Sequence, residues 1–179
     1  MNWIARLLFF KISGWKLEGT IDPSIKKCIL IVAPHTSWYD FYIGVLVRKI
    51  LNIQIDFVAK KELFKFPFGW YFKWMGGTGL DRISNQNKVE SIAQLFKTRD
   101  IFRLAISPEG TRKKTNRWKT GFYYIAKIAK VPIIMVAFDY EKKTVKFSEP
   151  FYTTNDLEKD FSEIHNFYKG VKGKIPEKF

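Results

Sequence analysis

The apolar positions of this chain form two patterns, short runs and longer stretches with helical spacing. The run at residues 28–33 is continuous and rich in β-branched residues, and Pro34 ends it, whereas two of the other runs include a charged residue, Asp56 or Arg103. Continuous apolar runs of this length are typical of strands that are buried on both faces of a sheet. We therefore predict strands at residues 28–33, 55–59, 103–106 and 132–138.

The stretches between and after these runs repeat apolar side chains three or four positions apart, which predicts helices at residues 85–97, 118–130 and 156–169. Strands that alternate with helices favour an α/β fold, and the length suits a single domain with a mostly parallel central sheet flanked by helices. Ligands of such folds bind at the carboxyl ends of the strands. His35 and Glu109 both follow predicted strand ends.

The N-terminal segment 3–12 contains eight apolar residues in ten. A helix that spans a bilayer needs roughly 20 apolar residues, so this segment is too short to cross one. Its cations, Arg6 and Lys11, suit a helix that lies in the interface beside anionic head groups. We predict a membrane-interfacial helix over residues 1–15 and one globular domain over residues 16–179. An ordinary helix packed on the core is the alternative.

The charge balance narrows the class of partner. A formal net charge of +14 attracts polyanions, which include nucleic acid, an anionic membrane surface and phosphorylated carriers. Aromatic residues make up 17% of the chain, and Trp and Phe settle at membrane interfaces. The sequence has no nucleic-acid motif, so no nucleic-acid partner is expected. A basic protein that binds lipid or nucleic acid without catalysis stays an alternative.

Three residues carry reactive side chains but are not expected to take part in catalysis. Cys28 cannot form an internal disulfide and lies in a predicted buried strand, where a small core side chain is favoured over an acyl-carrying thiolate. Ser107 lacks the Gly-x-Ser-x-Gly turn of serine hydrolases. His165 has no motif around it, which favours a surface histidine. No Cys/His cluster has metal-ligand spacing, so no metal site is expected.

A histidine and a carboxylate, His35 and Asp40, stand five positions apart at a predicted strand-to-helix turn, where their side chains can meet. A carboxylate bonded to one ring nitrogen fixes the tautomer and leaves the other nitrogen as a base. Such a pair can deprotonate an alcohol, although the spacing by itself also arises by chance.

Two further segments combine glycine with arginine. Residues 109–112 read Glu-Gly-Thr-Arg after a predicted strand, and an arginine with backbone N–H groups at such a turn can bind phosphate. A solvated turn is the alternative. Residues 76–82 predict a glycine-rich loop that ends on Arg82, and this loop fits neither the dinucleotide-binding nor the P-loop pattern.

The three segments, in this order, resemble the lysophospholipid acyltransferase family, whose bacterial members include 1-acylglycerol-3-phosphate acyltransferases. Residues 35–40 look like the family's His-x4-Asp motif, and residues 79–82 and 108–112 look like its second and third blocks. The resemblance implies that His35 and Asp40 are catalytic. It implies that the acceptor is bound by Arg82, Glu109, Gly110, Thr111 and Arg112.

The resemblance also implies a reaction and a location. A fatty acyl chain moves from acyl-CoA or acyl-carrier protein to the hydroxyl of a lysophospholipid such as 1-acylglycerol-3-phosphate, in phospholipid biosynthesis, with no cofactor besides the acyl donor. Residues 16–179 are then an acyltransferase domain, bound peripherally to the cytoplasmic face of the membrane. An O-acyltransferase of the same fold that acts on another lipid, such as an acylated amino acid, is the alternative.

Overall fold

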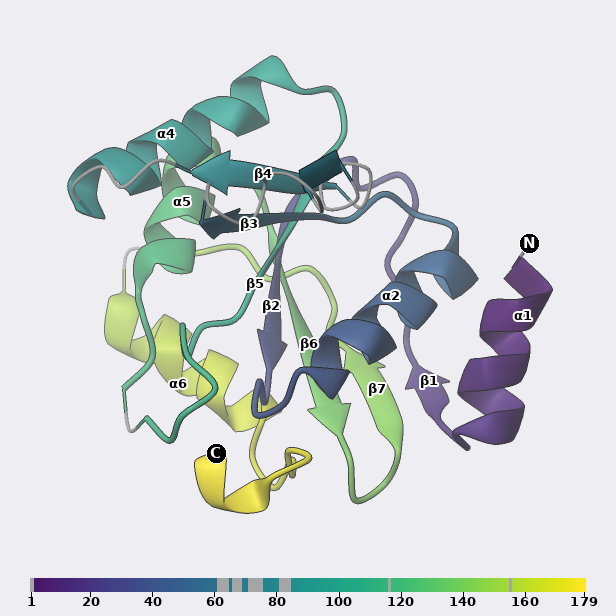
Figure 1. The fold of residues 1–179 in the computed structure, drawn as a ribbon. Coiled ribbons are helices and arrows are strands. Elements are labelled where there is room, and N and C mark those ends of the chain that lie inside the picture. The colour runs from purple at the N-terminus through teal and green to yellow at the C-terminus, as the bar shows by residue number, and fades with distance from the viewer. Residues whose placement is uncertain are drawn as a thin grey trace.

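A seven-stranded sheet forms the centre of the computed structural model (Figure 1), which describes residues 2–60, 65, 69–70, 76–80, 85–115, 117–154 and 156–179. The strands are β1 Lys16–Glu18, β2 Lys27–Ala33, β3 Asp56–Lys60, β4 Gly77–Leu80, β5 Phe102–Ile106, β6 Ile133–Asp139 and β7 Thr144–Phe147. Their order across the sheet is β1-β7-β6-β2-β5-β3-β4. β6 and β7 pair antiparallel, whereas the other strand pairings described are parallel. The predicted mostly parallel sheet is confirmed.

Helices cover both faces of this sheet. They are α1 Asn2–Arg6, the π-helix η1 Leu7–Ile12, α2 Tyr39–Leu51, α4 Asn85–Thr98, α5 Gly121–Ala129, α6 Leu157–Phe167 and the short 3-10 helix η3 Pro176–Lys178. α1, η1 and α2 pack on one face, and α4, α5 and α6 pack on the other (Figure 1). The single α/β domain predicted from the sequence is therefore confirmed.

The alternation of side chains along the central strands builds two cores. Successive side chains of a strand point to opposite faces of its sheet. In β2, Ile29 and Ile31 pack in the core beneath α4, α5 and α6, whereas Cys28 and Leu30 pack in the core beneath η1 and α2. Because both faces are covered, the strand needs apolar residues after Lys27, which explains the continuous apolar run at residues 28–33.

The predicted strands and helices are all present, and the two main differences from the prediction are the start of α5 and the strand β4. The four predicted strands are β2, β3, β5 and β6, and the three predicted helices are α4, α5 and α6. α5 begins at Gly121 rather than at residue 118, because the residues before it pack on the loop after β5, where Lys119 N–H donates to the Pro108 carbonyl at 2.7 Å. The prediction of a loop is wrong at Gly77–Leu80, which forms β4, because pairing with β3 overrides the low strand preference of glycine.

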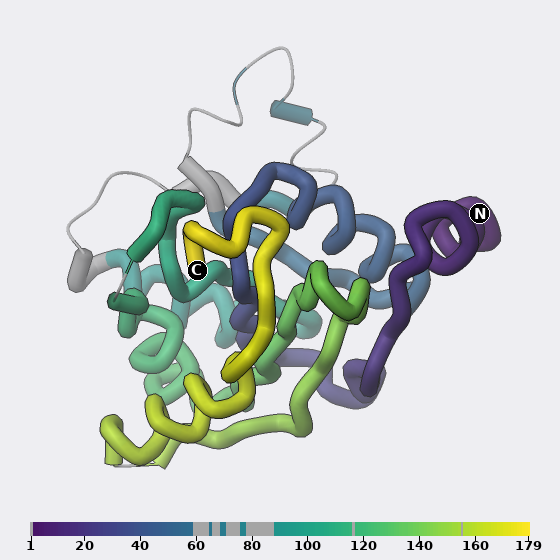
Figure 2. The backbone as a smooth tube through the Cα atoms, turned by 90° about the horizontal axis from the view of Figure 1, so that it is seen from below, coloured from purple at the N-terminus to yellow at the C-terminus, as the bar shows by residue number. Residues whose placement is uncertain are grey.

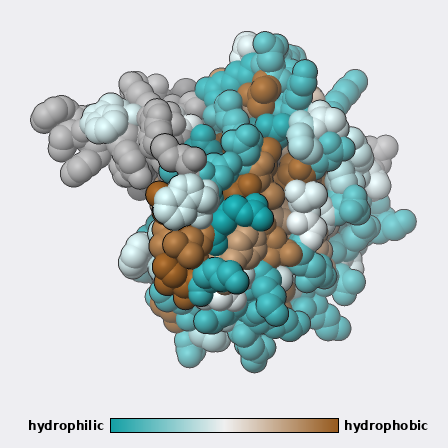
Figure 3. Space-filling view, turned by 90° about the vertical axis from the view of Figure 1, so that its right-hand side faces the viewer, coloured by the Kyte–Doolittle hydropathy of each residue, from teal (hydrophilic) through white to brown (hydrophobic). Residues whose placement is uncertain are grey.

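The N-terminal segment is helical, as predicted, and lies beside α2. Ala5 and Phe9 are buried in the core beneath α2, whereas Trp3 and Ile12 are 66% and 68% exposed. Figure 3 views the side of the molecule that carries α1 and shows apolar surface interrupted by hydrophilic side chains. The inner face of the segment is thus packed, and its outer face exposes apolar side chains beside Arg6 and Lys11. Within the described part of the chain, no helix has the length and apolarity needed to cross a bilayer.

Candidate active site

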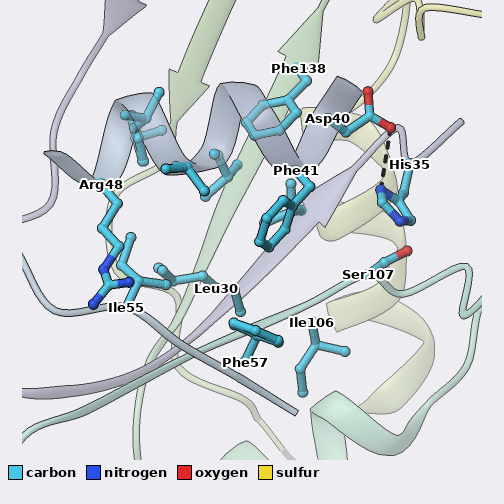
Figure 4. Close-up of a pocket in the computed structure, with 17 residues that line it drawn as sticks. Leu30, His35, Asp40, Phe41, Arg48, Ile55, Phe57, Ile106, Ser107 and Phe138 are labelled. Atoms are coloured by element: carbon cyan, nitrogen blue, oxygen red, sulfur yellow. Dashed lines mark ion pairs between the residues drawn. The ribbon is translucent and has the colours of Figure 1, made fainter. Parts of the chain in front are cut away.

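The loop after β2 brings His35 to Asp40, which lies in the first turn of α2. His35 Nδ1 lies 3.3 Å from Asp40 Oδ2, and the aspartate side chain is 2% exposed (Figure 4). The backbone N–H of Ser37 donates to the same oxygen at 2.8 Å, and the Tyr140 hydroxyl donates to Oδ1 at 2.6 Å. Both carboxylate oxygens are therefore held, and one of them faces Nδ1 of the imidazole.

Asp40 is ionised at neutral pH although it is buried. Burial by itself would raise the pKa of this carboxyl, but hydrogen bonds from His35, Tyr140 and Ser37 favour the charged form and hold the pKa below its usual value. An ionised carboxylate at Nδ1 stabilises positive charge on the imidazole ring. The arrangement therefore suits a ring that takes a proton at Nε2.

A second buried carboxylate, Glu109, holds the backbone of His35. β2 and β5 are adjacent parallel strands, so the loops at their carboxyl ends meet. The His35 N–H donates to Glu109 Oε2 at 2.9 Å and Oε1 at 3.1 Å, and the Ser107 hydroxyl donates to Oε2 at 3.1 Å. Burial raises the pKa of Glu109, and these hydrogen bonds oppose the rise. Glu109 therefore holds the backbone of the His35 loop in place through hydrogen bonds. Its expected contact with the acceptor stays a prediction.

The loop after β5 also carries three more of the residues predicted to bind the acceptor. Gly110 has a φ of +66°, a conformation that strains a side chain, and it turns the chain there. Thr111 Oγ1 accepts a backbone N–H two residues further on at 3.1 Å. Arg112 is exposed, and its Nε donates to His35 Nε2 at 3.3 Å. Arg82 lies outside the described residues. The loop thus brings one cation of the predicted phosphate site into contact with the imidazole.

An apolar pocket of about 240 Å³ lies beside the pair, between α2 and the sheet. His35 and Ser107 stand at one end of it and Arg48 at the other (Figure 4). Since Asp40 and Arg48 are eight residues apart on α2, the pocket extends about 12 Å along this helix. Its walls include Leu30, Val32, Phe41, Val45, Ile55, Phe57, Ile106 and Phe138.

This pocket could not be predicted from the sequence, because side chains from several separate elements line it. One local signal was present. Gly44 lies in the interior of α2, where glycine is unfavourable, and its missing side chain leaves space in the pocket wall.

The other reactive side chains lie away from this site. Cys28 is fully buried, and burial raises the pKa of its thiol to about 12, which excludes a reactive thiolate near neutral pH. His165 is an exposed residue of α6 whose ring lies 4.6 Å from that of Trp118. No group of three or more His, Cys, Asp or Glu residues in the described ranges could hold a metal ion.

Comparison with known proteins places the chain in a family. A family model described as Acyltransferase matches residues 17–139, which include His35, Asp40 and the loop after β5. No curated protein and no solved structure matches the chain significantly. Because the matched residues make up more than half of the sequence, the chain belongs to the acyltransferase family and is an acyl-transferring enzyme.

Proposed function

We propose that this enzyme transfers a fatty acyl chain from acyl-CoA or acyl-carrier protein to the hydroxyl of a lysophospholipid such as 1-acylglycerol-3-phosphate, in phospholipid biosynthesis. The observation that carries the proposal is the His35–Asp40 pair, which stands at the end of an apolar pocket and beside the exposed Arg112. A base, a site for an acyl chain and a cation for a phosphate are the three features that such a reaction needs.

His35 acts as the general base of the reaction. Its Nε2 takes the proton of the acceptor hydroxyl while that oxygen attacks the thioester carbonyl, and Asp40 stabilises the imidazolium that forms. When the tetrahedral intermediate collapses, the C–S bond breaks and the imidazolium returns the proton to the leaving thiolate. General-base assistance of this kind contributes roughly a 10²- to 10⁴-fold rate increase. The enzyme itself carries no acyl group at any stage.

Arg112 couples acceptor binding to this base. Its Nε donates to His35 Nε2, the nitrogen that must receive the proton. A guanidinium binds phosphate more strongly than a neutral ring nitrogen, because the bonds are charge-assisted and bidentate. The phosphate of the acceptor therefore draws Arg112 away and leaves Nε2 open to the acceptor hydroxyl. Arg82, Glu109, Gly110 and Thr111 complete the proposed acceptor site.

The acyl chain of the donor occupies the apolar pocket. Its thioester then lies at the end where His35 and Ser107 stand, and its tail extends along α2 toward Arg48. Each methylene that leaves water for such a pocket contributes about 0.8 kcal/mol to binding. A chain held in this way places the carbonyl against the base, and placement of reacting groups is a large part of catalysis.

The apolar outer face of the N-terminal segment binds the cytoplasmic face of an anionic membrane. Trp3, Ile4, Leu7 and Ile12 are exposed, and Arg6 and Lys11 lie among them. We expect a double Trp3→Ser and Ile12→Ser variant to bind anionic vesicles more weakly in a sedimentation assay, with its fold retained. Vesicle binding equal to that of the wild type would contradict this location.

The reaction is tested by transfer of radiolabelled palmitoyl groups from CoA, and from acyl-carrier protein, to a panel of acceptors. The panel contains lysophosphatidic acid, other lysophospholipids and an acylated amino acid. Label on lysophosphatidic acid supports the proposed acceptor. Label only on the acylated amino acid would keep the chemistry and replace the acceptor, and no transfer to any acceptor from either donor would contradict the proposal.

A further inference from the structure

One of the two carboxylate oxygens of Asp40 accepts a hydrogen bond from a residue outside the family match. Tyr140 lies one position beyond the matched residues 17–139, and its hydroxyl donates to Asp40 Oδ1 at 2.6 Å. The other oxygen, Oδ2, faces His35 Nδ1 and the Ser37 N–H. The Tyr140 hydroxyl therefore fixes the rotation of the carboxylate and leaves Oδ2 for the imidazole.

The Tyr140 side chain is itself held in place. The Trp15 ring packs edge-on against it, with ring centroids 4.8 Å apart, and the Tyr39 ring lies at 6.4 Å. The backbone N–H of Tyr140 donates to the carbonyl of Lys172 at 2.9 Å. Burial and the Asp40 carboxylate raise the pKa of Tyr140 above its usual value, so the hydroxyl keeps its proton and stays a donor.

The C-terminal segment 171–175 also holds the loop that carries His35. The Ile175 N–H donates to Thr36 Oγ1 at 3.2 Å. Gly173 lies so close to this loop that a Cβ there would come within 2.9 Å of the Thr36 side chain and 3.0 Å of Pro34 Cβ. Figures 1 and 2 show the C-terminal segment crossing the end of the sheet at which β2 finishes. The same segment thus contacts both Tyr140 and the His35 loop.

We propose that Tyr140 is a positioning residue for acyl transfer, whose hydroxyl, set in place by the C-terminal segment 171–175, holds Asp40 in the rotation that presents Oδ2 to His35. The inference rests on the proposed function, because it concerns the same catalytic pair. A carboxylate that rotates loses its contact with Nδ1 for part of the time. During that time, once the acceptor has drawn Arg112 away from Nε2, the neutral imidazole is free to carry its proton on Nε2, and this tautomer cannot act as the base.

Tyr140→Phe removes the hydroxyl and keeps the ring, and Tyr152→Phe, at a tyrosine that is 64% exposed, is the matched control. Residues that orient a metal-binding side chain typically contribute about 10- to 100-fold to activity, and Tyr140 orients Asp40 in a comparable way, so we expect kcat of Tyr140→Phe to fall at least about 10-fold at nearly constant KM. The control should retain the wild-type kcat.

A spectroscopic measurement separates positioning from a structural role. The chain has two histidines, and Arg112 Nε donates to His35 Nε2 and so favours the Nδ1-protonated tautomer by itself. The ¹⁵N chemical shifts of the His35 ring are therefore read in a background that carries both His165→Gln and Arg112→Ala. We expect neutral His35 to carry its proton on Nδ1 in this background and to populate both tautomers when Tyr140→Phe is added. A wild-type tautomer in this variant would overturn the inference, even if kcat falls. Because the measurement needs no activity, it tests the inference separately from the proposed reaction.

A second variant covers the case in which Tyr140→Phe does not fold, as judged by circular dichroism. Gly173→Ala leaves Tyr140 intact and forces the C-terminal segment away from Thr36. We expect it to lower kcat by about 10-fold and to mix the His35 tautomers in the same way. A Gly173→Ala variant with the wild-type kcat and tautomer would overturn the role of the segment.

Discussion

Substitutions at Gly44 test two properties of α2 separately, its stability as a helix and its contribution to the pocket wall. Helix interiors favour Ala over Gly by about 0.8–1.0 kcal/mol. A Cβ at this position would lie 4.0 Å from Phe138 Cζ, an ordinary van der Waals contact, so no repacking is needed. We therefore expect Gly44→Ala to raise the free energy of unfolding by about 1 kcal/mol, which for a chain of this size raises Tm by about 2–4 °C.

A side chain at the same position reduces the space for an acyl chain. The pocket has a volume of about 240 Å³, and a leucine at position 44 would project into it from the helix. Each methylene that loses its place in the pocket weakens binding by about 0.8 kcal/mol, or about fourfold. Gly44 lies four residues from Asp40, or about 6 Å along α2 from the His35 end of the pocket, so only a very short acyl chain ends before it. We therefore expect Gly44→Leu to lower kcat/KM for palmitoyl donors strongly and for butanoyl donors little, with Gly44→Ala between Gly44→Leu and the wild type.

The assay combines urea unfolding with steady-state kinetics for butanoyl-, lauroyl- and palmitoyl-CoA. Gly121→Ala is the matched control, because this glycine begins α5 and a Cβ there would meet nothing within 4 Å. The control should leave the chain-length preference unchanged. A Gly44→Leu variant with the wild-type preference would refute the acyl-chain assignment of the pocket, and a destabilised Gly44→Ala would refute the argument from helix propensity.

Three further predictions concern other parts of the site and fold. In steady-state kinetics, Arg112→Ala should raise KM for lysophosphatidic acid about 10-fold and leave KM for the acyl donor unchanged. The reason is that a hydrogen bond to a charged group contributes about 1.5–3 kcal/mol. An equal rise in KM for both substrates would contradict this prediction. Because burial raises the pKa of Glu109, this carboxyl stays protonated to a higher pH in the folded chain than in the unfolded chain. As pH rises above 4.5, the free energy of unfolding of the wild type should therefore fall relative to that of Glu109→Gln. A difference between the two proteins that does not change with pH, measured by urea unfolding, would refute this. Phe9→Ala should lower the free energy of unfolding by about 3–5 kcal/mol, because Phe9 is fully buried; an unchanged urea midpoint would show that the N-terminal segment is not part of the core.

The central strands could be predicted from the sequence because both of their faces are buried. Apart from Lys27 at the start of β2 and Asp139 at the end of β6, the residues of these strands are apolar, and such a run is visible without tertiary information. β1 and β7 have three and four residues, which is too short for a pattern to emerge. β4 contains two glycines among its four residues, and it is a strand only through its pairing with β3.

The meeting of site residues could be predicted only in part. The contact between His35 and Asp40 follows from their spacing at a strand-to-helix turn. His35 and Glu109 could both be placed at the carboxyl ends of strands, but their approach depends on the pairing of β2 with β5, which the sequence does not show. Tyr140 could not be found in this way, because 100 residues separate it from Asp40 and no local pattern relates them. The pocket likewise arises from the packing of α2 over the sheet. The catalytic and binding roles of these residues stay predictions.

The central claim is that His35, oriented by Asp40, removes the proton of the acceptor hydroxyl. It is tested most directly by kcat/KM for transfer of a radiolabelled palmitoyl group from CoA to lysophosphatidic acid, measured for the wild type, His35→Ala and Asp40→Asn. His165→Ala, which removes the chain's other histidine, is the control. We expect His35→Ala to lower kcat/KM by about 10²- to 10⁴-fold in a folded protein, Asp40→Asn to lower it as well, and the control to leave it unchanged. A folded His35→Ala enzyme with the wild-type kcat/KM would contradict it.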